Sequence, residues 1–112
     1  MENRIVSGIK EYIEEHLSDT LSIEFLSNHF HYSRAYISAK FTEATGRGIN
    51  EYISSKRIEQ AKDMLVHQSM NVSQISDHLG FSSVQYFSRR FKQMVGCSPT
   101  EFIASTQPEL DD

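Results

Sequence analysis

LSNHFHYS (residues 26–33) and ISDHLGFS (residues 75–82) are two versions of the same eight-residue stretch, separated by 49 positions. After one extra residue in the second copy, the match continues at an offset of 50. The further matching pairs are Tyr36 with Tyr86, Ile37 with Phe87, Ser38 with Ser88, Phe41 with Phe91 and Gly46 with Gly96. Apolar character is kept at the positions that each copy needs for a core, so the repeat predicts two similarly folded units.

The residues around the repeat show helical periodicity, with apolar side chains at three- and four-residue spacing. Only two prolines and five glycines occur, and they fall between the periodic stretches. Capping signals are expected at Ser22, Ser33, Asn71 with Gln74, Ser83, and Ser98-Pro99 with Glu101. The predicted helices cover residues 4–17, 22–30, 33–45, 49–67, 71–79, 83–95 and 98–105, where each helix with a capping residue is counted from that residue. No stretch alternates with a strand period, so the predicted fold is all-α with about seven helices.

A short helix, a tight turn and a second helix form the layout of a helix-turn-helix unit. In the first unit, Ile37, Phe41 and Ala44 are expected to face inward. The helix over 49–67 joins the two copies and would span about 28 Å at ~1.5 Å per residue, close to the ~34 Å between successive major grooves. A solenoid would also be self-similar, but it needs at least three repeats.

These patterns predict one bipartite DNA-binding domain over residues 1–106. It comprises a first helix-turn-helix subdomain (4–46), a linker helix (49–67) and a second subdomain (71–105). A flexible tail is expected over 107–112.

The net charge of −4 is unevenly distributed. Residues 33–96 carry nine Lys or Arg and five Asp or Glu, whereas the rest of the chain carries two and ten. The acidic residues are therefore concentrated away from the part of the chain that would meet a polyanion. This distribution is compatible with DNA binding, although a run of charges is usually only a solvated face.

Composition predicts a globular protein, with 38% hydrophobic and 23% charged residues. The single cysteine, Cys97, cannot form an internal disulfide, which favours a reducing cytoplasm. No apolar run reaches the ~20 residues of a membrane span, and a signal-peptide pattern is absent from the sequence. We expect a cytoplasmic protein that does not enter membranes.

The sequence offers no catalytic, metal or cofactor pattern. His29 and His31 lack the spacing of a metal site. Gly46-Arg47-Gly48 is too short to cradle a nucleotide, and no nucleophile is paired with a base. We therefore expect neither an enzyme nor a cofactor.

The second copy resembles the C-terminal signature of the AraC/XylS family of bacterial transcription regulators. The matching residues are GFSS (80–83), YFSRRFK (86–92), Gly96 and Ser98-Pro99. The first copy and the linker, including Arg57 and residues 61–65, are similar more loosely. The resemblance extends from about residue 4 to residue 105.

The resemblance implies seven helices, two helix-turn-helix subdomains and sequence-specific binding of double-stranded DNA at asymmetric promoter sites. It also implies contact with RNA polymerase, usually as an activator. Most members carry a separate sensing or dimerisation domain upstream. The chain is accordingly expected to be the DNA-binding part of a longer regulator.

Base-reading candidates in the second recognition helix are Val84, Gln85, Ser88 and Arg89. Gln85 suits a bidentate pair with adenine, Arg89 suits guanine, and Val84 suits the methyl group of thymine. The family resemblance places base contacts at the same early positions of this helix.

The first recognition helix offers Arg34, Ala35, Ser38 and Ala39, and the last three are small where the family often has longer polar side chains. Small side chains can touch a thymine methyl group but form no bidentate pairs. We therefore predict that the second unit supplies most of the hydrogen-bonded discrimination.

Contacts to DNA phosphates are predicted for Lys92, Ser33, Ser82, Ser83, Lys40 and Arg90. For each serine, helix capping alone is an equal alternative, and for Arg90 a structural ion pair is one. Lys56 is expected to face solvent, and Arg57 to tie the linker to a subdomain. The rival function is a helical protein-interaction module whose DNA-reading face has decayed, favoured by the net acidity and the small side chains at 35, 38 and 39.

Overall fold

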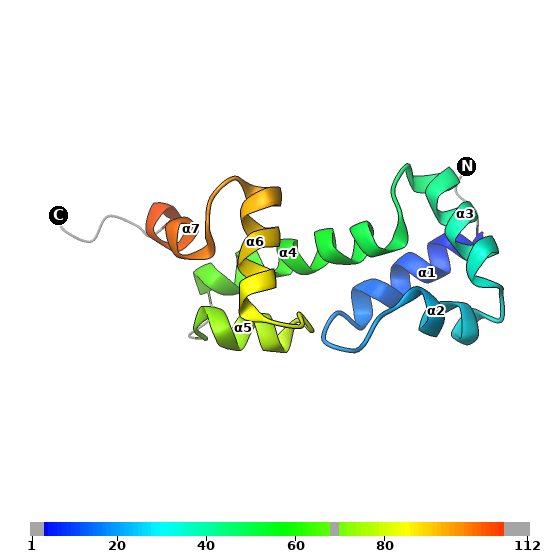
Figure 1. Cartoon of the computed structure of the whole chain (residues 1–112), viewed down its shortest axis with the longest axis horizontal. Coiled ribbons are helices and arrows are strands. Elements are labelled where there is room, and N and C mark those ends of the chain that lie inside the picture. The colour runs from blue at the N-terminus through cyan, green and yellow to red at the C-terminus, as the bar shows by residue number, and fades with distance from the viewer. Residues whose placement is uncertain (1–3, 68–69, 107–112) are drawn as a thin grey trace. The chain divides into compact units, whose positions relative to one another are not determined.

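Seven α-helices make up most of the computed structural model, which describes residues 4–67 and 70–106 (Figure 1). They are α1 (Arg4–Glu15), α2 (Ile23–Phe30), α3 (Arg34–Thr45), α4 (Ile49–His67), α5 (Val72–His78), α6 (Val84–Val95) and α7 (Pro99–Thr106). Neither described range contains a strand. The predicted all-α fold with seven helices is therefore confirmed, while the predicted flexible tail lies outside the described residues.

Serine hydroxyls begin three of the helices at the predicted positions. The Oγ atoms of Ser22, Ser33 and Ser83 accept the backbone N–H three residues ahead at 3.0, 3.1 and 3.0 Å. Each hydroxyl satisfies one of the N–H groups that the first turn of a helix leaves without a partner. The local signals in the sequence thus set where α2, α3 and α6 start.

Two reciprocal capping boxes begin α5 and α7, again as predicted. Asn71 Oδ1 accepts from the N–H of Gln74 at 2.8 Å, and Gln74 Oε1 accepts from the N–H of Asn71 at 2.9 Å. Ser98 Oγ accepts from the N–H of Glu101 at 3.1 Å, and Glu101 Oε1 accepts from the N–H of Ser98 at 2.9 Å.

Two local predictions were inaccurate. Helix α1 ends at Glu15 rather than at residue 17, because the N–H of His16 bonds to the carbonyl of Ile13 at 3.1 Å and tightens the turn. Leu17 is nevertheless buried just beyond the helix. Ala44 was expected to face the core but is exposed, because its side of the last turn of α3 is left uncovered.

The chain forms two compact units whose boundary lies between Lys56 and Arg57, inside α4. In the first unit, α1, α2, α3 and the start of α4 surround one core. Its fully buried members include Ile9, Leu26, Ile37 and Phe41. Burying a side chain of this size contributes about 1.5–3 kcal/mol, so this core holds the first helix-turn-helix unit together.

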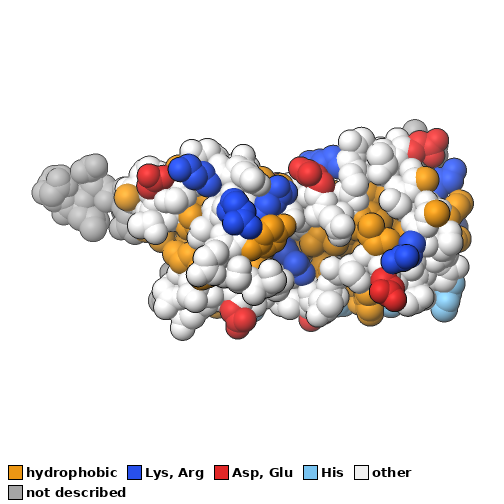
Figure 2. Space-filling view, viewed as in Figure 1, with side chains coloured by type: hydrophobic (Ala, Val, Ile, Leu, Met, Phe, Trp, Pro, Cys, Tyr) orange, Lys and Arg blue, Asp and Glu red, His pale blue; other side chains and the backbone are white. Residues whose placement is uncertain are grey.

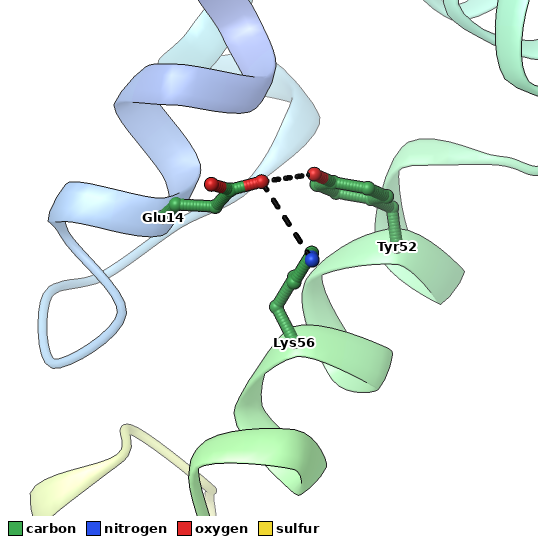
Figure 3. A network of polar contacts seen from close by, with 3 residues as sticks. All are labelled: Glu14, Tyr52 and Lys56. Carbon is green, nitrogen blue, oxygen red and sulfur yellow. Dashed lines mark hydrogen bonds and ion pairs between the residues drawn. The ribbon is translucent and has the colours of Figure 1, made fainter.

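A polar network joins α1 to the start of α4 within the first unit (Figure 3). The hydroxyl of Tyr52 donates to Glu14 Oε2 at 2.5 Å, and the ammonium group of Lys56 lies 3.8 Å from the same oxygen. Lys56 also lies over the ring of Tyr52, 5.6 Å from its centroid. Lys56 therefore does not simply face solvent, as the sequence suggested, but helps to fix α4 on α1.

The second unit is built around a more aromatic core. Ile75, Leu79, Phe87 and Phe91 are essentially fully buried there, together with apolar residues of α4. Phe91 meets Phe102 of α7 edge-on at 5.5 Å between ring centroids. This packing covers the inner side of α6 and leaves its other side on the surface.

Arg57 is the buried cation of this second unit. Its Nη1 donates to the carbonyl of Gly80 at 3.4 Å, and its guanidinium lies 6.0 Å from the centroid of the Phe81 ring. Burial lowers the pKa of Arg57 from its ordinary value. The structure agrees with the predicted role of Arg57, which ties the linker helix to the turn between α5 and α6.

The turns of the two helix-turn-helix units repeat the same backbone hydrogen bonds. In the first copy, the N–H of Tyr32 bonds to the carbonyl of Ser27 at 2.9 Å; in the second, the N–H of Phe81 bonds to the carbonyl of Ser76 at 3.1 Å. His31 and Gly80, at equivalent positions, both have left-handed backbone conformations, with φ of 65° and 82°. The repeat seen in the sequence is therefore also a repeat of backbone geometry.

Candidate nucleic-acid interface

The surface of α6 is separated into a core side and an outer side by helical spacing. Phe87 and Phe91 are fully buried, whereas Gln85, Ser88, Arg89 and Lys92 recur at i, i+3, i+4 and i+7 and therefore share the opposite side. Gln85, Arg89 and Lys92 are exposed, and Ser88 is half-buried. Figure 2 shows Lys and Arg side chains gathered over α6. The predicted residues thus lie on one helix face with donors and acceptors pointing away from the core.

Val84 stands apart from this group. It is half-buried at the first position of α6, directly after the capping Ser83. Its partial exposure leaves room for an apolar contact, as the prediction of a thymine contact requires.

Tyr86 is a surface residue that the sequence analysis did not single out. The residue is 36% exposed, and the guanidinium of Arg89 lies 5.7 Å from the centroid of its ring. This cation–π contact restricts the arginine side chain at the edge of the outer face. Tyr36 is its equivalent in the first copy: it is 38% exposed, with the ammonium group of Lys40 at 5.7 Å from its centroid. The signal that could have identified this pair was a repeated aromatic residue one position before each buried one.

The corresponding face of α3 has a different chemistry. Arg34, Ala35 and Ala39 are exposed and Ser38 is half-buried. A shallow hollow lies in the surface here, lined by Ile23 of α2 together with Arg34, Ala35 and Ser38. The structure therefore brings the four predicted residues to one side of α3, with short side chains and a depression in place of long polar groups.

The predicted phosphate-binding serines fall into two kinds. Ser33 and Ser83 are both exposed N-caps whose oxygens accept backbone N–H groups. A hydroxyl that accepts in this way can still donate its own hydrogen, so capping and phosphate binding are compatible. Ser82 lies exposed in the turn before the cap.

The predicted phosphate-binding cations differ in their surroundings. Lys40 lies 3.6 Å from Glu43. Lys40 is half-buried and Glu43 is exposed, so solvent reaches the pair, the pair is weak, and Lys40 can exchange it for a contact with a phosphate. Lys92 is exposed on the outer face of α6. Its charge also contributes to lowering the pKa of Glu101, after the larger effects of hydrogen bonds from the backbone and side chain of Ser98.

Arg90 makes a structural contact, but of another kind than the ion pair considered from the sequence. Its Nη1 donates to Gln93 Oε1 at 2.9 Å, and Nη2 lies 4.0 Å from the sulfur of Met94. Its Nε is buried and makes no hydrogen bond within the described residues. The guanidinium thus lies along its own helix, on the flank of the outer face.

Among the residues that the structure describes, no three His, Cys, Asp or Glu side chains come together as metal ligands. Within the same residues, none of the helices has the length and apolarity needed to cross a membrane.

Comparison with known protein families gives a match over most of the chain. A family model described as a helix-turn-helix domain matches residues 26–105. The match begins inside α2 and ends in α7, so it includes both repeats and all of α4.

Curated relatives are identical to this chain at about a third of the aligned residues. The regulatory protein PocR of Salmonella typhimurium is 33% identical over 91 residues, which make up 81% of this chain and 30% of PocR. The HTH-type transcriptional regulator YobQ of Bacillus subtilis, itself uncharacterised, is 36% identical over 88 residues, or 79% of this chain and 36% of YobQ. The chain thus spans about a third of the length of these relatives.

Solved structures share the fold over nearly the whole chain. The C-terminal domain of the response regulator AraT from Geobacillus stearothermophilus aligns with a TM-score of 0.91 and 23% identity, covering 98% of this chain and 92% of that one. The C-terminal domain of the response regulator YesN from Fusobacterium nucleatum aligns at 0.85 with 27% identity, covering 90% and 99%. The DNA-binding domain of AdpA, solved with a target DNA, aligns at 0.86 with 22% identity, covering 92% and 93%.

Proposed function

Because the chain belongs to the AraC-type helix-turn-helix domains, a family of DNA-binding domains of transcription regulators, we propose that it binds double-stranded DNA sequence-specifically through α3 and α6. The observation that carries this proposal is the outer face of α6. There Gln85 and Arg89 are exposed one turn apart, and these are side-chain types that pair bidentately with adenine and guanine in the major groove.

The two recognition helices contribute unequally. Gln85 and Arg89 form hydrogen bonds with base edges, whereas Ala35 and Ala39 occupy the same positions in α3 and can make only apolar contacts. The second unit therefore supplies most of the hydrogen-bonded discrimination. Arg34, the longest polar side chain in the first turn of α3, contacts a base edge or a phosphate there.

Affinity that does not depend on sequence comes from contacts to phosphates. Lys92 and Lys40 supply charge, Ser33, Ser82 and Ser83 supply hydroxyl donors, and Arg90 supplies a guanidinium at the flank of α6. Neutralising one phosphate releases counterions, so each cation that binds a phosphate steepens the salt dependence of binding.

The subdomains 4–46 and 71–105 and the linker helix 49–67 act as one binding domain that places its recognition helices in adjacent major grooves. The support is the length of α4, nineteen uninterrupted helical residues, which corresponds to about 28 Å. Inserting about five base pairs between the half-sites, close to half a turn of B-DNA, should therefore abolish simultaneous binding.

In the cell, the domain acts within a longer regulator whose other part senses a signal or mediates dimerisation. It contacts RNA polymerase as an activator, performs no catalysis and works in the cytoplasm, where bacterial promoters are found. The much greater length of relatives such as PocR supports the first of these statements.

A second candidate function is a protein-interaction module. The small side chains at 35, 38 and 39 and the acidic balance of the chain favour it. Such a module would bind DNA weakly and without sequence preference.

Selection from a random duplex pool, followed by mobility shifts at 50 and 200 mM salt, separates the two functions. A DNA reader enriches a sequence and loses affinity steeply with salt. Arg89→Ala should cost about 1–3 kcal/mol and relax the preference at one base pair. Lys92→Ala should weaken all sequences alike and lower the salt slope by about one ion.

Lys62→Ala is the matched control, because it removes the same charge from an exposed position of α4 outside both recognition helices. It should leave affinity and slope nearly unchanged. The DNA-reading assignment is wrong if no sequence is enriched, and the role of Arg89 is wrong if its loss leaves the base preference intact.

A further inference from the structure

The hollow beside α3 has a chemical character that the function proposed above does not use. Its lining consists of Ile23 from the first position of α2 and Arg34, Ala35 and Ser38 from the first two turns of α3. Ile23 packs against the core of the first unit but is only partly buried, so its side chain also forms part of the surface. The hollow is therefore bounded by two apolar side chains, one hydroxyl and one cation.

The depression persists because the side chains on this face are short. Ala35 and Ala39 stand where the second copy has Gln85 and Arg89, and both alanines are exposed. A glutamine at position 35 would extend over the hollow. The first unit thus presents an open apolar recess at the place where the second unit presents long polar groups.

We propose that this hollow receives the 5-methyl group of a thymine, so that the first half-site is read by contacts to thymine methyl groups. This inference rests on the proposed binding of α3 in a major groove. Thymine is the only base that carries an apolar group on its major-groove edge, next to an O4 acceptor. Ile23 and Ala35 supply the apolar contact, and the hydroxyl of Ser38 supplies a donor for O4.

Charge favours the same occupant. Arg34 lines the hollow and is exposed, so a phosphate beside the base can meet its guanidinium while the methyl group enters the recess. An apolar protein side chain would gain the contacts with Ile23 and Ala35 but would leave the guanidinium without an anionic partner. The combination of an apolar recess and a flanking cation fits a nucleotide better.

Replacing thymine with deoxyuridine removes only the methyl group and keeps base pairing and the O4 acceptor. On the selected duplex, a single substitution at the thymine read by the hollow should weaken binding about three- to fivefold, as expected for removal of one buried methyl group from the contact. Each thymine of the first half-site is substituted in turn, and the dissociation constants are measured by mobility shift or fluorescence anisotropy.

Ala35→Gln supplies the matched variant, because it introduces the residue of the second copy at an exposed position and leaves the core unchanged. In this variant the deoxyuridine effect in the first half-site should disappear, while any deoxyuridine effect in the second half-site, such as one through Val84, should remain. Circular dichroism confirms that the variant is folded.

The outcomes separate this inference from the function on which it rests. Failure to enrich any DNA sequence overturns the proposed function. Specific binding with no sensitivity to deoxyuridine in the first half-site leaves that function standing and overturns the methyl-reading hollow. A methyl effect that survives unchanged in Ala35→Gln also overturns it, because the methyl group must then lie elsewhere.

Discussion

Gly80 combines two structural requirements, and replacing it with alanine tests both. Its φ of 82° lies in the left-handed region, where a Cβ costs about 1–2 kcal/mol. A Cβ built on Gly80 would also lie 2.9 Å from Nη2 and 3.1 Å from Cζ of Arg57. The guanidinium cannot stay in place, so Gly80→Ala should disturb the contact between α4 and the turn that precedes α6.

Besides the backbone cost, Gly80→Ala loses the free energy of the contacts that Arg57 makes, and its size follows from those contacts. The hydrogen bond to the Gly80 carbonyl is long, at 3.4 Å, and the contact with Phe81 is a cation–π interaction at 6.0 Å. Together they account for about 1–2 kcal/mol. Gly80→Ala should therefore destabilise the second unit by about 2–4 kcal/mol, the sum of the backbone and Arg57 contributions.

A double-mutant cycle isolates the share of the destabilisation by Gly80→Ala that is due to the lost contacts of Arg57. Arg57→Ala alone removes the same contacts, so the double variant should be more stable than the sum of the single effects predicts, by about 1–2 kcal/mol. Gly96→Ala is the control in the same unit, because its φ is 104° but no atom lies within 4 Å of the added Cβ. It should lose only the backbone contribution and show no coupling to Arg57.

The chain has no tryptophan whose fluorescence could follow unfolding. Amide hydrogen exchange under denaturant is therefore the assay, because it measures the stability of each unit separately. The amide of Phe91 reports on the second core and that of Phe41 on the first. Additive effects of Gly80→Ala and Arg57→Ala, within about 0.3–0.5 kcal/mol, would refute the steric argument. Equal coupling of Gly96→Ala to Arg57 would refute it as well.

Three further predictions concern caps and the α1–α4 contact. Asn71→Ala should destabilise the second unit by about 1 kcal/mol, measured by the same amide exchange; an unchanged value would mean that the capping box is not formed in solution. The pKa of Glu101, read by NMR titration, should lie below its ordinary value, chiefly because its carboxylate accepts the N–H of Ser98. The ionised carboxylate therefore stabilises α7 at pH values above the ordinary pKa. This stabilisation is lost as the pH falls through the lowered pKa of the folded state. Ser98→Ala should raise that pKa only in part, since the N–H remains, and a full return to the ordinary value would contradict this order of causes. Tyr52→Phe should cost the first unit about 0.5–1.5 kcal/mol by removing its bond to Glu14, and this loss should be smaller in a Glu14→Ala background.

The helix starts could be predicted because their determinants are local. A serine or asparagine cap and the residue three positions ahead decide the geometry within one turn, and both are visible in sequence. The end of α1 could not be predicted, because Leu17 continues the apolar spacing while the turn at His16 ends the helix. The exposure of Ala44 depends on which elements extend over the last turn of α3, and that is a property of the assembled unit.

The candidate site was likewise predictable only where its features depend on local spacing in the sequence. Helical spacing alone placed Gln85, Ser88 and Arg89 opposite the buried phenylalanines. The arrangement around Tyr86 was not foreseen, because an aromatic residue directly before a buried one, repeated as Tyr36 and Tyr86, cannot be recognised as a surface residue until the burial of its neighbour is known. The hollow at Ile23 could not be foreseen either, because it depends on how α2 and α3 pack.

The turn of each helix-turn-helix unit requires a left-handed residue, but its neighbours decide which residue is acceptable. In the first unit this position is His31, which is exposed, so a side chain fits once its backbone strain of about 1 kcal/mol is offset. In the second unit the guanidinium of Arg57 occupies the space that a Cβ would need. Counting back 49 residues from Arg57 leads to Gly8 in the first unit, where no such side chain exists. Arg57 therefore requires glycine at position 80. The first unit has no arginine at the equivalent position, so a residue with a side chain, His31, fits in its turn.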